Sequence, residues 1–170
     1  MSERLSWLNA LPDLEAQAEL LRCCGSIRWA RQVAQARPFA SFEELLEVAD
    51  GMWWSLDAED WLEAFRAHPR IGEKKPAAGE PAGTERWSAQ EQSGMQRSRD
   101  EVRAALARGN QEYEERFGHI FLVCATGKSG EGMLALLQER LGNDPETELR
   151  VAAEEQRKIT HLRLEKLLQS

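Results

Sequence analysis

Apolar residues recur three or four positions apart along most of this chain, and that spacing predicts α-helices rather than strands. In the first predicted helix, Leu14, Ala18 and Leu21 fall on one face, which we expect to be buried. The predicted helices span about residues 13–23, 26–37, 41–52, 57–68, 88–108, 111–117, 129–141 and 145–168. We therefore expect an all-α protein, a single-domain helical bundle of about eight to nine helices over residues 1–170.

Residues that favour helix ends set several of these boundaries. His68 precedes Pro69, and proline disfavours the α conformation in the residue before it, so one helix is expected to end at His68. Gly109-Asn110 is expected to interrupt the helical pattern that follows Ser88.

Two segments depart from the helical pattern. Residues 120–125 form a short apolar run that we expect to be buried, although periodicity alone does not distinguish a strand from a helix there. Residues 69–84 form a long loop that holds three of the six prolines. Loops of this length usually carry function or are disordered.

Composition limits the classes of function. The 170 residues are 30% charged and 42% hydrophobic, as in a soluble globular domain. A net charge of −7 and a pI near 5.1 argue against nucleic acid or an anionic membrane as a partner. No apolar run approaches the ~20 residues that span a bilayer.

Three cysteines (Cys23, Cys24, Cys124) cannot form a closed set of disulfides, and the first residues do not resemble a secretory signal, so we expect a cytoplasmic protein.

A histidine and a carboxylate flank the long loop. His68 ends one predicted helix, and Glu91 lies about a turn into the next. An imidazole positioned by a carboxylate is suited to proton transfer at neutral pH. The competing interpretation is structural: His68 only ends a helix, and Glu91 completes a capping box with Ser88. Residue types alone favour the structural interpretation.

Two further patterns are less informative. Thr126-Gly127-Lys128-Ser129 resembles part of a phosphate-binding loop, but Leu122 stands where that motif requires glycine, so a turn before a helix is the better interpretation. The three histidines, His68, His119 and His161, lack the spacing of a helical ligand pair, and no metal site is expected.

Arg163 lies on a stripe of the last predicted helix with Gln156, Ile159 and Leu167. It either packs its stem on apolar neighbours and pairs with a nearby glutamate, or it faces a cleft and binds a substrate carboxylate or ureido oxygen. Residue types leave both open.

Many of these residues belong to one ordered set of motifs. The set reads Phe65-x-x-His68-Pro69-x-Ile71-Gly72, Ser88-x-x-Glu91-Gln92, Asn110-x-x-Tyr113-x-x-x-Phe117-Gly118-x-x-Phe121, Gly127-Lys128-Ser129, Arg140-Leu141-x-Asn143 and Arg163-Leu164-x-x-Leu167. With this set the chain resembles the 2-oxo-4-hydroxy-4-carboxy-5-ureidoimidazoline (OHCU) decarboxylases over nearly its whole length. The resemblance implies an all-α, usually homodimeric enzyme that uses no cofactor and forms (S)-allantoin in urate degradation.

The resemblance also implies the site residues. His68 matches the family's proposed proton donor, and Glu91 would orient His68 or bind the ureido nitrogens. The implied substrate contacts are Pro69, Ser88, Gln92, Phe121, Leu122, Val123, Cys124, Ala125 and Arg163. Two other functions remain open: a helical interaction module without catalytic activity, and a different lyase or hydrolase on the same scaffold.

Overall fold

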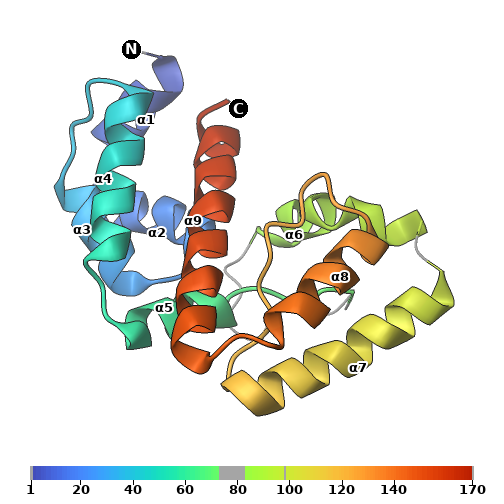
Figure 1. Ribbon diagram of the computed structural model, residues 1–170. Coiled ribbons are helices and arrows are strands. Elements are labelled where there is room, and N and C mark those ends of the chain that lie inside the picture. The colour runs from blue at the N-terminus through green and yellow to red at the C-terminus, as the bar shows by residue number, and fades with distance from the viewer. Residues whose placement is uncertain (1, 73–82, 98, 170) are drawn as a thin grey trace. The chain divides into compact units, whose positions relative to one another are not determined.

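The computed structural model describes residues 2–72, 83–97 and 99–169 (Figure 1). In these residues it contains nine α-helices, one 3₁₀ helix and no strand, which confirms the all-α prediction. The helices are α1 (Glu3–Ala10), α2 (Asp13–Cys23), α3 (Ile27–Gln35), α4 (Phe42–Trp54), α5 (Ala58–Arg66), α6 (Glu85–Glu91), η1 (Ser93–Arg97), α7 (Asp100–Phe117), α8 (Gly130–Arg140) and α9 (Pro145–Gln169). Most of the predicted loop of residues 69–84 lies outside the described residues.

The chain forms two compact units. The first comprises Met1–Ala64 and Arg157–Ser170, and the second comprises Phe65–Gln156. The second unit is therefore an insertion in the sequence of the first, and the boundaries fall within α5 and α9. That residues 1–170 act as one domain stays a prediction.

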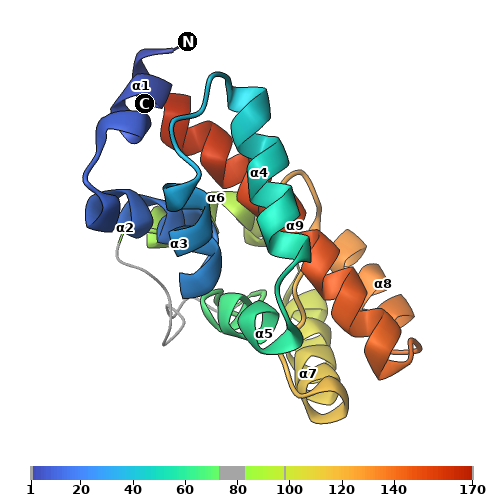
Figure 2. The same cartoon turned by 90° about the vertical axis from the view of Figure 1, so that its left-hand side faces the viewer.

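In the first unit, α2 packs on α3 and α3 packs on α4 (Figures 1 and 2). Ser26, where the predicted helix of residues 26–37 begins, caps α3, because its Oγ accepts the N–H of Trp29 at 3.2 Å. The indole of Trp29 is fully buried and donates its Nε1–H to the carbonyl of Ala49 in α4 at 3.0 Å. A buried aromatic side chain with its polar atom satisfied thus joins α3 to α4.

The predicted buried face of α2 is wrong. The helix buries Ala16, Leu20 and Cys23, whereas Leu14 is 79% exposed. Both faces carry small or apolar residues at helical spacing, so the periodicity of this short helix did not distinguish them.

The second unit has a core built mainly by α7, α8 and the segment between them. Its buried members are Ile71, Met95, Leu106, Tyr113, Phe121, Val123, Ala125, Met133 and Leu137. The predicted break at Gly109-Asn110 is wrong, since α7 continues through both residues. A Cβ at position 109 would lie 2.4 Å from Cδ2 of Leu137, so Gly109 allows α8 to approach rather than ending α7.

The predicted helix of residues 88–108 is replaced by α6, η1 and the first part of α7. Ser88 lies inside α6, which begins at Glu85, so the capping-box interpretation of Ser88 and Glu91 is wrong. A Cβ on Gly94 in η1 would lie 2.1 Å from the carbonyl oxygen of Lys128, so the two backbones meet closely there.

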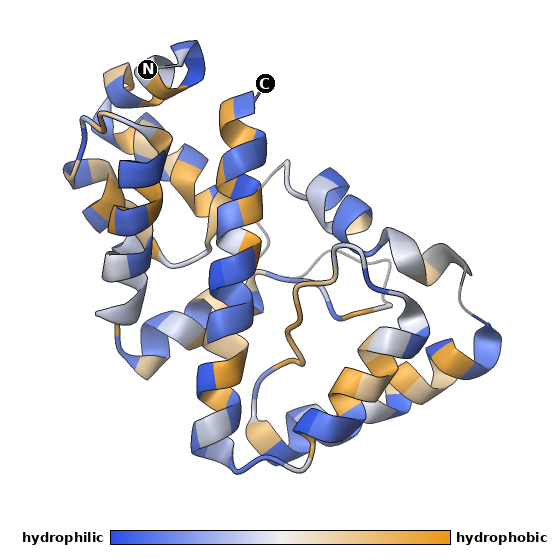
Figure 3. Cartoon of the chain, turned by 45° about the horizontal axis from the view of Figure 1, so that its top comes forward, coloured by the Kyte–Doolittle hydropathy of each residue, from blue (hydrophilic) through white to orange (hydrophobic). Residues whose placement is uncertain are grey.

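Residues 121–125 form neither a helix nor a strand but a buried extended segment. Figure 3 shows the connection between α7 and α8 partly in the colour of hydrophobic residues. Phe121, Val123 and Ala125 join the core of the second unit, because alternate residues of an extended chain point to the same side.

Candidate active site

His68 lies two residues beyond the end of α5, which stops at Arg66 rather than at the predicted His68. Its side chain is buried, with 7% of the residue exposed. The backbone N–H of His68 donates to the carbonyl of Phe65 at 3.1 Å, and its ring Nε2 lies 2.7 Å from Oε1 of Gln156. Pro69, which follows, is half-buried. The predicted proton donor is therefore a buried imidazole with a defined polar partner.

The chain directly after His68 is bonded to α7 and to the end of α6. Arg70 donates Nε–H and Nη2–H to the two carboxylate oxygens of Glu114, each at 2.8 Å. Gly72 has a φ of 88°, in the left-handed region that favours glycine, and donates its N–H to Oε1 of Gln92 at 2.9 Å. Gln92, predicted as a substrate contact, thus also holds the backbone near the histidine.

Helix α6 buries polar residues and exposes an apolar one. Ser88 and Glu91 are 6% and 8% exposed, whereas Ala89 and Gln90 between them are exposed. Neither residue is without an interaction partner. Burying a carboxylate is costly unless it is well partnered, so this reversed pattern is typical of a polar site rather than of helix packing.

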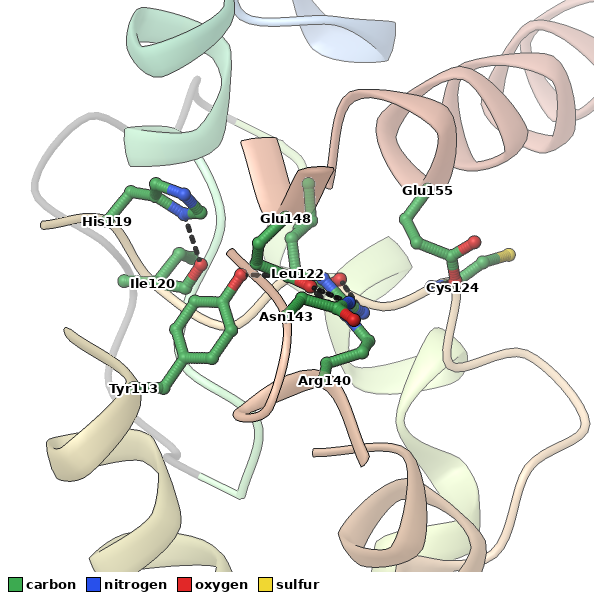
Figure 4. A network of polar contacts seen from close by, with 9 residues as sticks. All are labelled: Tyr113, His119, Ile120, Leu122, Cys124, Arg140, Asn143, Glu148 and Glu155. Atoms are coloured by element: carbon green, nitrogen blue, oxygen red, sulfur yellow. Dashed lines mark hydrogen bonds and ion pairs between the residues drawn. The ribbon is translucent and has the colours of Figure 1, made fainter. Parts of the chain in front are cut away.

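The extended segment is held by side chains that bond its backbone. Arg140 donates Nη1–H to the carbonyl of Leu122 at 2.7 Å. The N–H of Cys124 donates to Oε1 of Glu155 at 3.0 Å, and its carbonyl accepts from Nζ of Lys128 at 2.7 Å. Figure 4 shows Arg140 and Glu155 beside this segment. Lys128, which belongs to the sequence that resembles part of a phosphate-binding loop, therefore has a structural partner.

A buried ionic network fixes Arg140. Its Nε–H and Nη2–H donate to Oε2 of Glu148 at 2.9 and 2.6 Å, and the hydroxyl of Tyr113 donates to the same oxygen (Figure 4). Asn143 donates Nδ2–H to the other carboxylate oxygen at 3.0 Å. Burial raises the pKa of Tyr113, with Glu148 acting in the same direction, so Tyr113 remains a donor at neutral pH.

Val123 differs from its neighbours in the segment. Within the described residues, no hydrogen bond involves its N–H or its C=O, and the residue is 2% exposed. Buried backbone groups are nearly always paired.

Glu91 and the extended segment lie close together in the second unit. Burial raises the pKa of Cys124, the nearby Lys128 lowers it, and the carboxylates of Glu155 and Glu91 raise it further. Charges act on a thiol in this way only at short range. The structure thus brings one predicted catalytic residue to the segment predicted to bind substrate.

Arg163 belongs to the first unit and is described within it. The residue is 3% exposed and donates Nη1–H to the carbonyl of Arg22, in the last turn of α2, at 3.1 Å. Burial raises the pKa of both Cys23 and Cys24 to about 12, and the positive charge of Arg163 acts in the opposite direction. Arg163 is therefore a buried cation at a helix C-terminus, where the helix dipole favours positive charge.

The other two histidines have structural surroundings. His119 packs on the rings of Phe65 and Tyr113, with centroids 5.4 and 5.5 Å away, and burial lowers its pKa. His161 places Nε2 2.6 Å from Oδ1 of Asp50. Among the described residues, no three or more His, Cys, Asp or Glu side chains are grouped to hold a metal ion, and no helix has the length and apolar character needed to cross a bilayer.

Sequence reasoning missed Glu155 and Gln156, consecutive residues of α9 that bond the extended segment and His68. Gln156 was noted only because it shares a helical stripe with Arg163. A glutamine two turns before an arginine on a helix is a weak sign of a functional residue. The partner of Gln156, His68, lies 88 residues away in the chain, so no local pattern links them.

Comparison with known proteins gives consistent matches. The family model described as OHCU decarboxylase matches residues 9–165. The uric acid degradation bifunctional protein of Arabidopsis thaliana is 40% identical over 146 residues, which are 85% of this chain and 45% of that protein. The OHCU decarboxylase of Amia calva is 34% identical over 140 residues, 82% of this chain and 79% of that one. A crystal structure of OHCU decarboxylase in the presence of (S)-allantoin is similar with a TM-score of 0.77 at 37% identity, covering 90% of this chain and 99% of that chain.

Proposed function

The chain belongs to the OHCU decarboxylase family, and on that premise we propose that it converts OHCU to (S)-allantoin in urate degradation, without a cofactor. The observation that carries the proposal is the burial of both His68 and Glu91 in the second unit, with Glu91 close to Cys124 of the extended segment. Helix packing alone gives no reason to bury an imidazole and a carboxylate, since each loses its hydration.

The chemistry requires little from a protein beyond placement and proton transfer. The carboxylate of OHCU stands on a ring carbon that also bears a hydroxyl and adjoins an unsaturated ring carbon. When the carbon–carboxylate bond breaks, its electron pair passes into the unsaturated ring, and carbon dioxide leaves. The ring itself accepts these electrons, so the reaction needs no separate electron acceptor. One proton is then delivered to one face of the ring, which fixes the configuration of the product.

The proposed roles follow from where the residues lie in the second unit. His68 delivers the proton, because imidazole exchanges protons readily near neutral pH. Glu91 orients the imidazole or accepts hydrogen bonds from the ureido group. Ser88, on the same buried face of α6, contacts the substrate, and so does the half-buried Pro69. The side chain of Gln92 supports the wall of the site through Gly72.

The extended segment supplies backbone groups for the same substrate. The N–H and C=O of Val123, which have no hydrogen-bond partner among the residues that the structure describes, are suited to an imidazoline ring and a ureido group, which carry both donors and acceptors. Phe121, Leu122, Cys124 and Ala125 complete the segment that we propose to line the pocket.

We assign Arg163 to the substrate carboxylate or a ureido oxygen. Its guanidinium is buried, and one terminal nitrogen is held by the carbonyl of Arg22, which restricts its rotation. A guanidinium presents paired N–H donors that match a carboxylate, and such pairs are among the stronger hydrogen bonds in proteins.

We also propose a homodimer in the cytoplasm. The family resemblance supports the dimer, and three free, buried cysteines without a disulfide are typical of a reducing compartment. A mass in solution of about twice the 19.3 kDa of the chain is the expected result for the dimer.

His68→Ala tests the proposed function. We expect loss of the enzymatic acceleration with normal helical content, because His68 lies beyond the end of α5 rather than within a helix. Removing a buried partner of Gln156 should lower stability by only about 1–3 kcal/mol. His161→Gln is the matched control, since it replaces a histidine bonded to Asp50 and should retain activity. Persistent formation of (S)-allantoin by folded His68→Ala would rule out the proton-donor role.

A further inference from the structure

The clearest unassigned contact near the proposed site joins His68 to Gln156. Gln156 is fully buried in α9, and its Oε1 lies 2.7 Å from Nε2 of His68. Glutamine is seldom fully buried, because its amide must find partners away from water. This side chain therefore has a specific reason to be in the interior.

The chemistry of the two atoms fixes which of them donates. An amide oxygen accepts hydrogen bonds and cannot donate them, so the hydrogen must be on Nε2 of the imidazole. A neutral histidine with Nε2–H has its lone pair on Nδ1. The contact thus selects one of the two neutral tautomers and one orientation of the ring.

Gln156 is well placed to act in this way because of the residue before it. Glu155 accepts the N–H of Cys124 at 3.0 Å, so consecutive residues of one helical turn bond two parts of the proposed site. One part follows α5 and the other connects α7 to α8. A helix backbone is rigid on this scale, so the pair sets how the imidazole lies relative to the extended segment.

We propose that Gln156 is a positioning residue: it accepts the Nε2–H of His68 and so holds the ring in one orientation, with Nδ1 as the ring atom that takes up a proton and delivers it to the substrate. The neutral ring is then the Nε2–H tautomer, and the proton that His68 delivers is the Nδ1–H of the imidazolium. The inference rests on the proposed function for its effect on catalysis, but the tautomer itself is a property of the free protein. A neutral amide also suits a proton donor better than a carboxylate would. A carboxylate at this position would stabilise the imidazolium and make its proton harder to release.

The test compares Gln156→Met with Gln156→Glu by nuclear magnetic resonance of the imidazole nitrogens and by kinetics. Long-range ¹H–¹⁵N spectra distinguish the tautomers, and the signals of His68 are assigned by their absence in His68→Ala. In the unmodified chain at a pH where the ring is neutral, we expect Nε2–H.

In Gln156→Met, which keeps the length but removes the acceptor, we expect a mixture of tautomers. The kcat should fall about 10- to 100-fold with little change in KM, as for other residues that orient a functional imidazole.

Gln156→Glu keeps an oxygen acceptor and adds a negative charge. We expect it to retain the Nε2–H contact and to raise the pKa of the imidazole by about 1–2 units, which moves the histidine-dependent limb of the pH profile to higher pH. Gln111→Met, an exposed glutamine on α7, is the matched control and should change neither readout.

Failure of the proposed role of Gln156 and failure of the proposed decarboxylase activity give different results. An unchanged tautomer, kcat and pH profile in both Gln156 variants would overturn the positioning role while leaving the decarboxylase assignment intact. Absence of OHCU decarboxylation by the unmodified protein would overturn the function, and the spectra would still decide the tautomer. If Gln156→Met does not fold, the direction of the shift in Gln156→Glu decides, and no shift counts against the proposal.

Discussion

For Glu91 the structure removes the structural explanation, a capping box with Ser88, and so favours a role in the site. Its proposed capping partner, Ser88, lies within α6, so no capping box exists to explain the carboxylate. Glu91 is nonetheless 8% exposed and close enough to Cys124 to affect the pKa of that thiol. A charge that serves the site rather than the helix should matter for rate more than for stability.

Glu91→Gln tests that expectation, since glutamine keeps the length and removes the charge. We expect near-native melting and a loss of at least ~10² in kcat/KM, the lower range for a positioned acid–base group. Glu85→Gln, at the exposed start of the same helix, is the control and should behave like the unmodified chain. Full activity in Glu91→Gln would show that the charge is dispensable, and a large loss of stability would return Glu91 to a structural role.

At the residue scale, candidate site residues could be recognised in the sequence, but the residues that hydrogen-bond to them could not. His68, Glu91 and Arg163 are recognisable from residue type and motif order, and all three are buried. Gln156 was not recognised as the partner of His68, because a contact across 88 residues leaves no local pattern. The sequence gives no sign of the backbone groups of Val123 either, since every residue except proline carries an N–H and a C=O.

At the scale of secondary-structure elements, ends fixed by nearby side chains were predicted correctly. Ser26 caps α3 and Ser129 caps α8, each through a bond to an N–H three residues on. The predicted elements were wrong where contacts between residues far apart in the chain determine the local structure. Gly109 lies within α7 where Leu137 of α8 packs closely against it. Side chains of Arg140, Glu155 and Lys128 bond the backbone of Leu122 and Cys124.

Gly94→Ala tests how closely η1 must approach the turn before α8. The new Cβ would lie 2.1 Å from the carbonyl oxygen of Lys128, and a backbone atom cannot move away as a flexible side chain can. We expect a loss of about 1–3 kcal/mol in the free energy of unfolding, measured by urea denaturation. Gly51→Ala is the matched control: nothing lies within 4 Å of its Cβ position inside α4, so alanine should stabilise by about 0.5–1 kcal/mol. Equal stability of Gly94→Ala and the unmodified chain would contradict the close approach.

At the scale of the whole molecule, the all-α class followed from the helical periodicity of nearly every long segment. The division into two units did not, because the second unit is inserted between residues 64 and 157 and no linker marks either boundary. Arg163 belongs to the first unit, and His68, Glu91 and the extended segment belong to the second.

The most direct test of that activity is the stereochemistry and rate of allantoin formation from freshly generated OHCU. Spontaneous decay of OHCU sets the background rate and gives no preference for one enantiomer, because no asymmetric proton donor takes part. We expect the purified protein to accelerate the reaction in proportion to its concentration and to form (S)-allantoin, followed by circular dichroism of the product. A rate equal to spontaneous decay, or a racemic product, would contradict the assignment of this chain as an OHCU decarboxylase.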